Sequence, residues 1–400
     1  MGVYGAIVSI IAFYCRLARP FISLGVAKRA RAGALQLFEL ATRRFWPLEY
    51  VASSLEWGHS SCVKSVAVIG NHVYTGCWDF LIKKWDARSG ACVHTFVGHQ
   101  QDIIGIAPSP SGRWLFSCGD LCRMWDVETG EEIARFGQGT YYCAVANATH
   151  VFAAKANGLI EEFEYADAAG VPLAEGSVID GRRSLAGHLA GVMDFDLRGD
   201  LLVSASIDMT ARTWSIEQGA LVQTFSGHRD ALRCCSLWRD CVFTGGLDRT
   251  IRQWSLASGE CLLVVQRHTA AVRALLTVGD SLYSAASDKR IIEWDLGPAA
   301  QGGSELTPLR SLDEHTDGVF ALCEAGGYLY SGSADKRCLR WSMRTGDVTQ
   351  EYTSRTAIEA PSVLLELLLR QPLREMLPGW LKPVRWAQAF LRDVEKAARR

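Results

Sequence analysis

Histidine and aspartate residues recur along the chain at a spacing that could support acid–base chemistry. In five places an aspartate follows a histidine by 20 residues, and in a sixth place by 21. Beside a serine or threonine, such a pair is the constellation that performs acyl transfer in hydrolases. Six equivalent sets cannot all be active sites, so the repetition points to a structural role. The pairs are His59 and Asp79, His99 and Asp120, His188 and Asp208, His228 and Asp248, His268 and Asp288, and His315 and Asp335.

A tryptophan follows each of these aspartates by six residues, or by five in one case, which makes the pattern a repeat. The tryptophans are Trp85, Trp125, Trp214, Trp254, Trp294 and Trp341. A seventh, degenerate copy fills the gap before Gly187, with Gln138, Asn157 and Phe163 at the matching positions. The seven copies between residues 51 and 354 average about 43 residues each, the length expected of a four-stranded propeller repeat.

Within each copy, short stretches rich in β-branched and aromatic residues alternate with turns, which predicts four strands per copy. No long helix separates the copies, and this excludes a parallel α/β sheet. The Gly-His, Asp and Trp-Asp elements, such as Trp85-Asp86, Trp125-Asp126 and Trp294-Asp295, resemble the WD-repeat family over about three quarters of the chain. The resemblance implies an all-β, seven-bladed WD-repeat β-propeller.

The resemblance also implies that a serine or threonine on the second strand joins each histidine, aspartate and tryptophan in one hydrogen-bonded network. The matching residues are Thr75, Ser117, Ser204, Thr244, Ser284 and Ser331. We expect these sets to pair the buried polar groups of loops packed between blades, and not to catalyse a reaction. The third blade has Gln138, Ala153, Asn157 and Phe163 instead, so we expect it to depend on apolar packing and to be locally looser.

A further set of residues is expected around the mouth of the central channel, on the face that carries the histidine loops and aspartate turns. Arginine, methionine and large aromatic side chains are enriched at binding hot spots, so we interpret the set as partner-binding; ordinary packing is the alternative. The candidates are Lys64, Trp78, Met193, Arg233, Arg273 and Phe320. Two insertions, Ala166–Val178 and Gly297–Thr307, are expected to project from the opposite face as solvated loops.

The composition limits the classes of function. The net charge of −1 gives no reason to expect nucleic acid as a partner. No phosphate-binding loop, dinucleotide loop, HExxH motif or Gly-x-Ser-x-Gly elbow occurs, so we expect no cofactor, no catalytic residue and no small-molecule substrate. The 13 cysteines are odd in number and scattered through apolar stretches without metal-ligand spacing. We therefore expect no metal site and a reducing, intracellular compartment.

Both ends of the chain differ from the middle. Residues 1–50 carry seven basic and two acidic residues, and residues 355–400 carry nine basic and five acidic residues. The middle of the chain, residues 51–354, therefore carries 26 basic and 36 acidic residues. We therefore expect a helical, apolar and basic extension over 1–50, a propeller over 51–354 and a helical basic extension over 355–400. Either Ala52–Glu56 or Val348–Thr353 is expected to form the outer strand of the last blade.

The N-terminal extension has three interpretations. Its apolar run Val3–Cys15 is short for a membrane span, so residues 1–45 could anchor the chain in or on a membrane, dock into a partner, or act as a targeting signal. Location in an organelle, for example the mitochondrion, is a further alternative. The C-terminal stretch Val384–Ala398 places Trp386 and Phe390 on one face, suited to packing on the propeller, on a partner or on an anionic surface.

Together these features predict a non-catalytic scaffold or structural subunit of a larger assembly of proteins, and association of that assembly with a membrane is left open. One alternative is a substrate-recognition adaptor, for instance of a ubiquitin ligase, which a segment similar to an F-box would favour; no clear one precedes the propeller. The alternative from another class is an enzyme. It would require one polar cluster that breaks the repeat symmetry, and none stands out.

Overall fold

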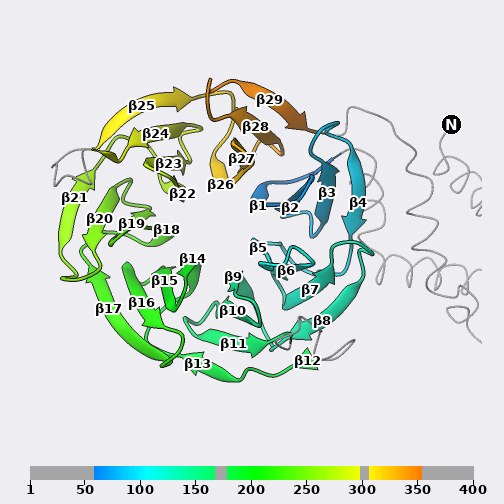
Figure 1. Cartoon of the computed structure of the whole chain (residues 1–400), viewed down its shortest axis with the longest axis horizontal. Coiled ribbons are helices and arrows are strands. Elements are labelled where there is room, and N and C mark those ends of the chain that lie inside the picture. The colour runs from blue at the N-terminus through cyan, green and yellow to red at the C-terminus, as the bar shows by residue number, and fades with distance from the viewer. Residues whose placement is uncertain (1–57, 167–177, 298–305, 354–400) are drawn as a thin grey trace, which may run out of the picture. The chain divides into compact units, whose positions relative to one another are not determined.

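The computed structural model describes residues 58–166, 178–297 and 306–353. Within them the chain is all β, and the expected seven-bladed propeller is confirmed (Figure 1). The helical extensions expected over 1–50 and 355–400 lie outside the described residues, as do Ala52–Glu56 and most of both insertions. No helix in the described ranges is long and apolar enough to cross a membrane.

Each blade is an antiparallel sheet whose strands follow one another from the central channel to the circumference (Figure 1). Blade 1 contains β1 (Val63–Ile69), β2 (His72–Cys77), β3 (Ile82–Asp86) and β4 (Cys92–Phe96). Blade 2 contains β5 (Gly105–Pro108), β6 (Trp114–Cys118), β7 (Cys122–Asp126) and β8 (Glu132–Phe136). Blade 3 contains β9 (Tyr141–Ala146), β10 (His150–Lys155), β11 (Ile160–Glu164) and β13 (Arg183–Leu185).

The remaining four blades follow the same order. Blade 4 contains β14 (Val192–Arg198), β15 (Leu201–Ser206), β16 (Thr210–Ser215) and β17 (Ala220–Ser226). Blade 5 contains β18 (Leu232–Trp238), β19 (Cys241–Gly246), β20 (Ile251–Ser255) and β21 (Cys261–Val265). Blade 6 contains β22 (Val272–Val278), β23 (Ser281–Ala286), β24 (Ile291–Asp295) and β25 (Thr307–Leu312). Blade 7 contains β26 (Val319–Ala325), β27 (Tyr328–Ser333), β28 (Cys338–Ser342) and β29 (Val348–Tyr352).

The insertion in blade 3 adds a strand to its neighbour. The short strand β12 (Val178–Ile179) pairs in parallel with β8, opposite Arg135 and Phe136, and makes blade 2 five-stranded. The chain then returns to form β13, the outer strand of blade 3. The insertion therefore bridges the outer edges of blades 2 and 3.

The apolar core lies between blades. Seven buried clusters are present in the described residues, and each joins the strands of two adjacent blades. The six repeat tryptophans are at most 2% exposed and belong to these clusters or contact them. Because both faces of every sheet are covered by a neighbour, the second strands are buried almost throughout, as in β2 and β15.

The last blade is closed by its own chain. Of the two candidate outer strands, Val348–Thr353 supplies β29, which pairs with β28 from Cys338 to Trp341. The described chain thus begins in blade 1 and ends in blade 7, and the two blades exchange no strand. Side chains join them instead: Arg340 Nη1 and the Tyr352 hydroxyl both donate to the Ala87 carbonyl, at 2.7 and 3.1 Å.

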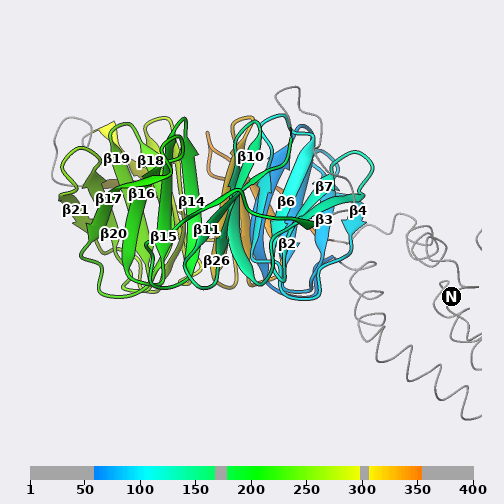
Figure 2. The same cartoon turned by 90° about the horizontal axis from the view of Figure 1, so that it is seen from below.

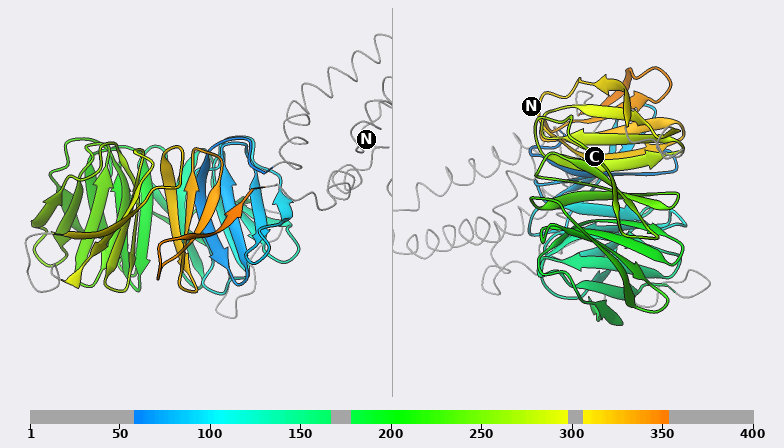
Figure 3. Two further views of the ribbon diagram at one scale, coloured as in Figure 1. Left: turned by 90° about the horizontal axis from the view of Figure 1, so that it is seen from above. Right: turned by 90° about the vertical axis from the view of Figure 1, so that its left-hand side faces the viewer.

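The strands of every blade run between the two faces of the ring (Figures 2 and 3). Inner strands start at the face that carries the histidine loops and end at the opposite face. Because the chain reverses at each turn, the turn between the second and third strands returns to the first face. All histidine loops and aspartate turns therefore share one face, called here the His–Asp face.

Candidate functional site

The repeated network of polar side chains, present in six of the seven blades, is seen most simply in blade 5. His228 Nδ1 lies 2.8 Å from Asp248 Oδ2, and His228 Nε2 lies 2.7 Å from the Thr244 hydroxyl. The indole N–H of Trp254 donates to the same Thr244 oxygen at 2.7 Å. Since an indole can only donate, the threonine hydrogen points to the histidine, and the imidazole proton points to Asp248.

The same contacts occur in five other blades. Across all six sets, the histidine–aspartate distances are 2.5–2.9 Å and the histidine–hydroxyl distances are 2.6–2.8 Å. The tryptophan–hydroxyl distances are 2.7–2.9 Å. The structure therefore brings together every residue of the six sets that the repeat alignment grouped, including Ser117 in the shorter blade 2.

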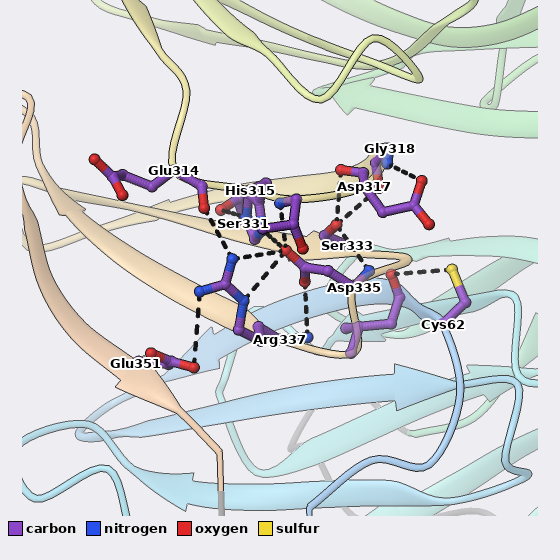
Figure 4. Close-up of polar contacts among 12 residues, drawn as sticks. Cys62, Glu314, His315, Asp317, Gly318, Ser331, Ser333, Asp335, Arg337 and Glu351 are labelled. Carbon is purple, nitrogen blue, oxygen red and sulfur yellow. Dashed lines mark hydrogen bonds and ion pairs between the residues drawn. The ribbon is translucent and has the colours of Figure 1, made fainter.

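Blade 7 shows how the network reaches the surface (Figure 4). His315 contacts Asp335 at 2.8 Å, and the Asp335 carboxylate also accepts the Arg337 guanidinium at 3.0 Å. Arg337 donates in turn to the Glu314 carbonyl at 2.8 Å. One carboxylate thus fixes the histidine loop, the aspartate turn and the following strand to one another.

The hydroxyl groups of these sets are unsuited to nucleophilic attack. All six are fully buried, so no substrate can approach them. Each oxygen already accepts from an indole and donates to an imidazole, as Thr244 does. The resemblance to a hydrolase triad is therefore confined to residue types, and the geometry is that of a saturated internal network.

Electrostatics strengthen the network in blade 5. Burial alone would raise the pKa of the Asp248 carboxyl, but hydrogen bonds from His228, from the backbone of Arg229 and from Thr250 outweigh it. The pKa of Asp248 is therefore lowered below its ordinary value. A carboxylate held ionised in a buried site is a strong acceptor for the Nδ1 proton of the imidazole.

One set brings a thiol close to its histidine and aspartate. The ligand atoms of His59, Cys77 and Asp79 lie within 4.8 Å of one another and are buried. Both nitrogens of His59 are used by the network, and the Cys77 sulfur accepts the Asp79 amide at 3.4 Å. Ser206 and Ser333 do the same in blades 4 and 7, at 3.1 Å. Burial also raises the pKa of the Cys77 thiol, and the thiolate is the form that binds metal. We therefore interpret this cluster as structural.

Blade 3 replaces the network with different contacts. Gln138, which stands at the histidine position, is exposed. Glu161 accepts instead from the Tyr141 hydroxyl, and Lys155 Nζ donates to it at 2.7 Å. Phe163, at the tryptophan position, is fully buried with its ring centroid 5.4 Å from that of Phe136. The blade thus combines an aromatic cluster with one separate ionic contact.

Five of the six partner-binding candidates meet at the start of the inner strands on the His–Asp face. They are Lys64, Trp78, Arg233, Arg273 and Phe320, called here the channel-mouth cluster. Lys64 Nζ lies 3.3 Å from the centroid of the Phe320 ring and 4.2 Å from that of the Trp78 ring. The Arg273 guanidinium lies 5.2 Å from the Phe320 ring centroid. Trp78 is 42% exposed, so the cluster is open to solvent.

The three cations of this cluster repel one another. Burial lowers the pKa of Lys64 to about 8, and the charges of Arg273 and Arg233 add to the effect. Burial and Arg233 lower the pKa of Arg273 as well. Arg273 donates to the Ser287 hydroxyl at 2.8 Å, while the buried Nε of Arg233 has no hydrogen-bond partner. Among the described residues, none of the three cations forms an ion pair with a carboxylate.

The sixth candidate, Met193, lies on β14 at the equivalent place and is half-buried. Sequence reasoning passed over the residues directly after each histidine and each turn aspartate, which lie on the same face. On blades 5 to 7 these include four exposed basic side chains; on blade 4 they are Leu189 and Met209, 88% and 46% exposed. The basic residues are Arg229, Arg249, Lys289 and Lys336. Extending the repeat comparison to the positions directly after each histidine and each aspartate would have found them.

The opposite end of the channel has a different character. A cavity of about 450 Å³ lies there, lined mainly by aliphatic side chains such as Val66, Ile106 and Leu276. Of its few polar side chains, Thr277 already donates to the Leu237 carbonyl at 2.9 Å. A small-molecule site usually combines an apolar pocket with converging polar groups, which this cavity does not offer.

Comparison with known proteins identifies the repeats. Residues 90–126, 181–215, 219–255 and 306–342 match the family model described as WD domain, G-beta repeat. Each matched segment starts at the outer strand of one blade and ends with the third strand of the next. The repeat unit is therefore offset from the blade by one strand, and each repeat ties two neighbouring blades together.

Three curated relatives show the range of similar proteins. Nuclear distribution protein PAC1 of Arthroderma benhamiae is 28% identical over 212 residues, covering 45% of this chain and 46% of that protein. Nuclear distribution protein nudF of Emericella nidulans is 29% identical over 207 residues, with coverage of 45% and 46%. Zinc finger CCCH domain-containing protein 17 of Oryza sativa subsp. japonica is 28% identical over 176 residues, with coverage of 43% and 38%. The matches span less than half the length of these relatives.

A solved structure shares the fold. The computationally designed Ika8 protein superimposes with a TM-score of 0.54 and 22% sequence identity. The match covers 71% of this chain and 97% of that chain. At this identity the similarity concerns the propeller architecture alone.

Proposed function

The chain belongs to the WD-repeat β-propeller family, and from this premise we propose that it is a non-catalytic scaffold or structural subunit that holds other proteins. The observation that carries the proposal is the channel-mouth cluster. It places two aromatic rings and three basic side chains at one solvent-accessible spot on a rigid ring. Such combinations concentrate binding energy at protein interfaces.

The internal hydrogen-bonded networks also support a non-catalytic role. The six histidine–aspartate–hydroxyl sets of the described residues have the residue types of a hydrolase triad, but their hydroxyls are fully buried and saturated. They stabilise the loops and turns that form the His–Asp face. A rigid face with loops of fixed geometry is what a docking platform requires, since little conformational entropy is lost on binding.

We predict that charge reversal of Arg233 and Arg273 together weakens the binding of partner proteins by about tenfold or more while the propeller stays folded. The test is affinity purification of the full-length protein and the Arg233→Glu/Arg273→Glu variant from native extracts, with quantification of the proteins that co-purify. Circular dichroism and thermal melting verify that the variant is folded.

The matched control reverses two exposed arginines, Arg88 and Arg344, in turns of the opposite face. The Arg88→Glu/Arg344→Glu variant should keep its partners. Unaltered recovery of every partner by the first variant, or equal loss in the control, would move the binding surface elsewhere.

We infer the cellular compartment and the attachment of this scaffold from its cysteines and its N-terminal segment. All 12 cysteines in the described part of the chain are free thiols, which supports a reducing, intracellular compartment. The partial similarity to proteins named for nuclear distribution supports our proposal of an intracellular setting. The basic, apolar residues 1–45 are our proposed attachment to that assembly or to its membrane.

A further inference from the structure

The charge of the channel-mouth cluster is unbalanced. The charges of Arg273 and Arg233 lower the pKa of Lys64, and Asp102 opposes them. No carboxylate within the described ranges forms an ion pair with any of the three cations. The aromatic rings of Phe320 and Trp78 cover Lys64 but cannot neutralise it. Gathering three partly buried cations without counter-charge destabilises the folded state, and an incoming anion would relieve that cost.

The unbalanced charge continues outward over blades 5 to 7. Arg229, Arg249, Lys289 and Lys336 are exposed on the His–Asp face, and none forms an ion pair within the described residues. Exposed carboxylates also lie on this face, and two of them accept backbone amides. Asp230 accepts the amide of the next residue at 2.7 Å, and Asp317 does the same in blade 7.

Backbone geometry fixes three of these basic side chains. Arg249, Lys289 and Lys336 have φ angles of 67°, 76° and 70°, in the left-handed region that favours glycine. Phe80 and Met209, at the same place in blades 1 and 4, have φ angles of 68° and 66°, so this geometry belongs to the aspartate turn of the repeat. The tight turn directs each of these residues outward at the same place of its blade.

The rest of the propeller has the opposite sign. Residues 51–354 carry 36 acidic and 26 basic residues, so a basic face here is not a reflection of overall composition. On the opposite face, Arg239 pairs with Asp280 at 2.7 Å. The seven basic side chains of the channel-mouth cluster and of blades 5 to 7 form no such ion pair within the described residues.

We propose that the channel-mouth cluster and the four basic residues of blades 5 to 7 bind an acidic segment of a partner protein. Carboxylate or phosphate groups of that segment contact Arg233, Arg273 and Lys64 at the mouth, and the segment continues over Arg249, Lys289 and Lys336. The proposal rests on the proposed docking function and adds the chemistry of the docked segment.

The test uses the full-length protein and fluorescent peptides of about twelve residues, long enough to span roughly 40 Å when extended. One peptide carries regularly spaced glutamates, a second carries phosphoserines at the same places, and a third carries glutamines. Fluorescence anisotropy should show glutamate or phosphoserine binding at least about tenfold tighter than glutamine, weakening as salt rises from about 50 to about 300 mM. The anionic peptide that binds more tightly shows whether the partner segment supplies carboxylates or phosphates.

Two variants test the residues separately. Arg233→Met/Arg273→Met keeps an apolar stem at the mouth, and Arg249→Glu/Lys289→Glu/Lys336→Glu changes exposed side chains only. Each should lose about tenfold in affinity for the anionic peptide. The matched control Arg88→Glu/Arg344→Glu, on the opposite face, should bind as the unaltered protein does.

Equal binding of the glutamine peptide, or equal loss of affinity in the control, would overturn the proposal. Tighter binding of a single-stranded oligouridine of similar length would also overturn it, since the face would then be selective for nucleic acid. If partners are lost from Arg233→Glu/Arg273→Glu but acidic peptides do not bind, the docking function stands and the acidic chemistry is wrong. If acidic peptides bind but partners are retained, the docking function fails and the anion site remains.

Discussion

At the scale of single residues, the protein depends on hydrogen bonds that run in one direction. In blade 5 the order is Trp254 to Thr244 to His228 to Asp248, and each group is used once as the chemistry of its atoms allows. Removing the last acceptor leaves the buried His228 Nδ1–H with only the Thr250 hydroxyl, at 3.4 Å, as a partner. The cost falls on stability, because no reaction passes through this chain of bonds.

We predict that Asp248→Ala lowers the free energy of unfolding by about 1–3 kcal/mol at neutral pH. The folded-state pKa of Asp248 lies below the unfolded value of 3.8, so its contribution is complete above that pH and is lost as the pH falls below it. The difference between the two proteins should therefore shrink between about pH 5 and pH 2 in urea unfolding experiments.

The matched control is Asp240→Ala, which removes an exposed carboxylate in the turn after β18. It should change stability by less than about 0.5 kcal/mol. Equal stability of Asp248→Ala and the unaltered protein would mean that the network does not stabilise the blade.

At the scale of elements, the junctions between blades are unequal. Asp194 and Asp196 on β14 accept the backbone amides of Cys235 and Leu237 on β18 at 3.0 and 2.7 Å. The Trp238 indole donates to the Gly279 carbonyl after β22 at 2.9 Å. Blades 4, 5 and 6 are thus linked along the channel by bonds in addition to packing. Blades 7 and 1 share neither a strand nor a connecting segment among the described residues.

We therefore predict that the ring opens first between blades 7 and 1. Tyr352 is 1% exposed and packs with Trp85 of blade 1 at 6.4 Å between ring centroids. Tyr352→Ala should destabilise the protein by about 3–5 kcal/mol. In hydrogen exchange, amides of β1–β4 and β26–β29 should lose protection before those of β14–β21.

Val348→Ala on the same strand is the control, because Val348 is 36% exposed. It should stay within about 0.5 kcal/mol of the unaltered protein. A uniform loss of protection around the ring in Tyr352→Ala would show that the seven junctions open together.

At the scale of the whole molecule, the propeller is complete without the N-terminal extension. Residues 58–353 supply every described strand, so deleting residues 1–45 removes none of them. The deleted segment is basic and rich in apolar residues, and exposed apolar surface is costly unless lipid or protein covers it. We therefore expect residues 1–45 to be dispensable for folding of the propeller and to be required for its attachment.

We predict that the chain without residues 1–45 folds into a soluble propeller that is released from its membrane or assembly. Fractionation of native extracts beside the full-length protein measures the release. Deletion of residues 384–400, which are also basic, is the control and should leave the protein attached. Identical sedimentation of the full-length and N-terminally truncated proteins would exclude the N-terminal segment as the anchor and make the segment around Trp386 and Phe390 the next candidate.

The sequence alone determined the number of blades and the members of the six networks. Both follow from spacing within a repeat, and a repeat places equivalent residues in equivalent geometry. A Trp–Ser–His–Asp set such as Trp214, Ser204, His188 and Asp208 is local to one blade, so no information about ring closure is needed to assemble it.

The tertiary structure decided what happens between blades. Both candidates for the last outer strand had β-forming composition, and only the occupied edge of β28 selects Val348–Tyr352. Likewise, Lys64 and Phe320 occupy the same position in their repeats, but the contact between them exists only because the two ends of the ring come together. Blade 3 lost its histidine network, and the Tyr141–Glu161–Lys155 contact that replaces it has no counterpart in other blades. The spacing of residues in the sequence reveals the contacts that the repeated copies share, whereas the contacts between copies depend on how the ring closes.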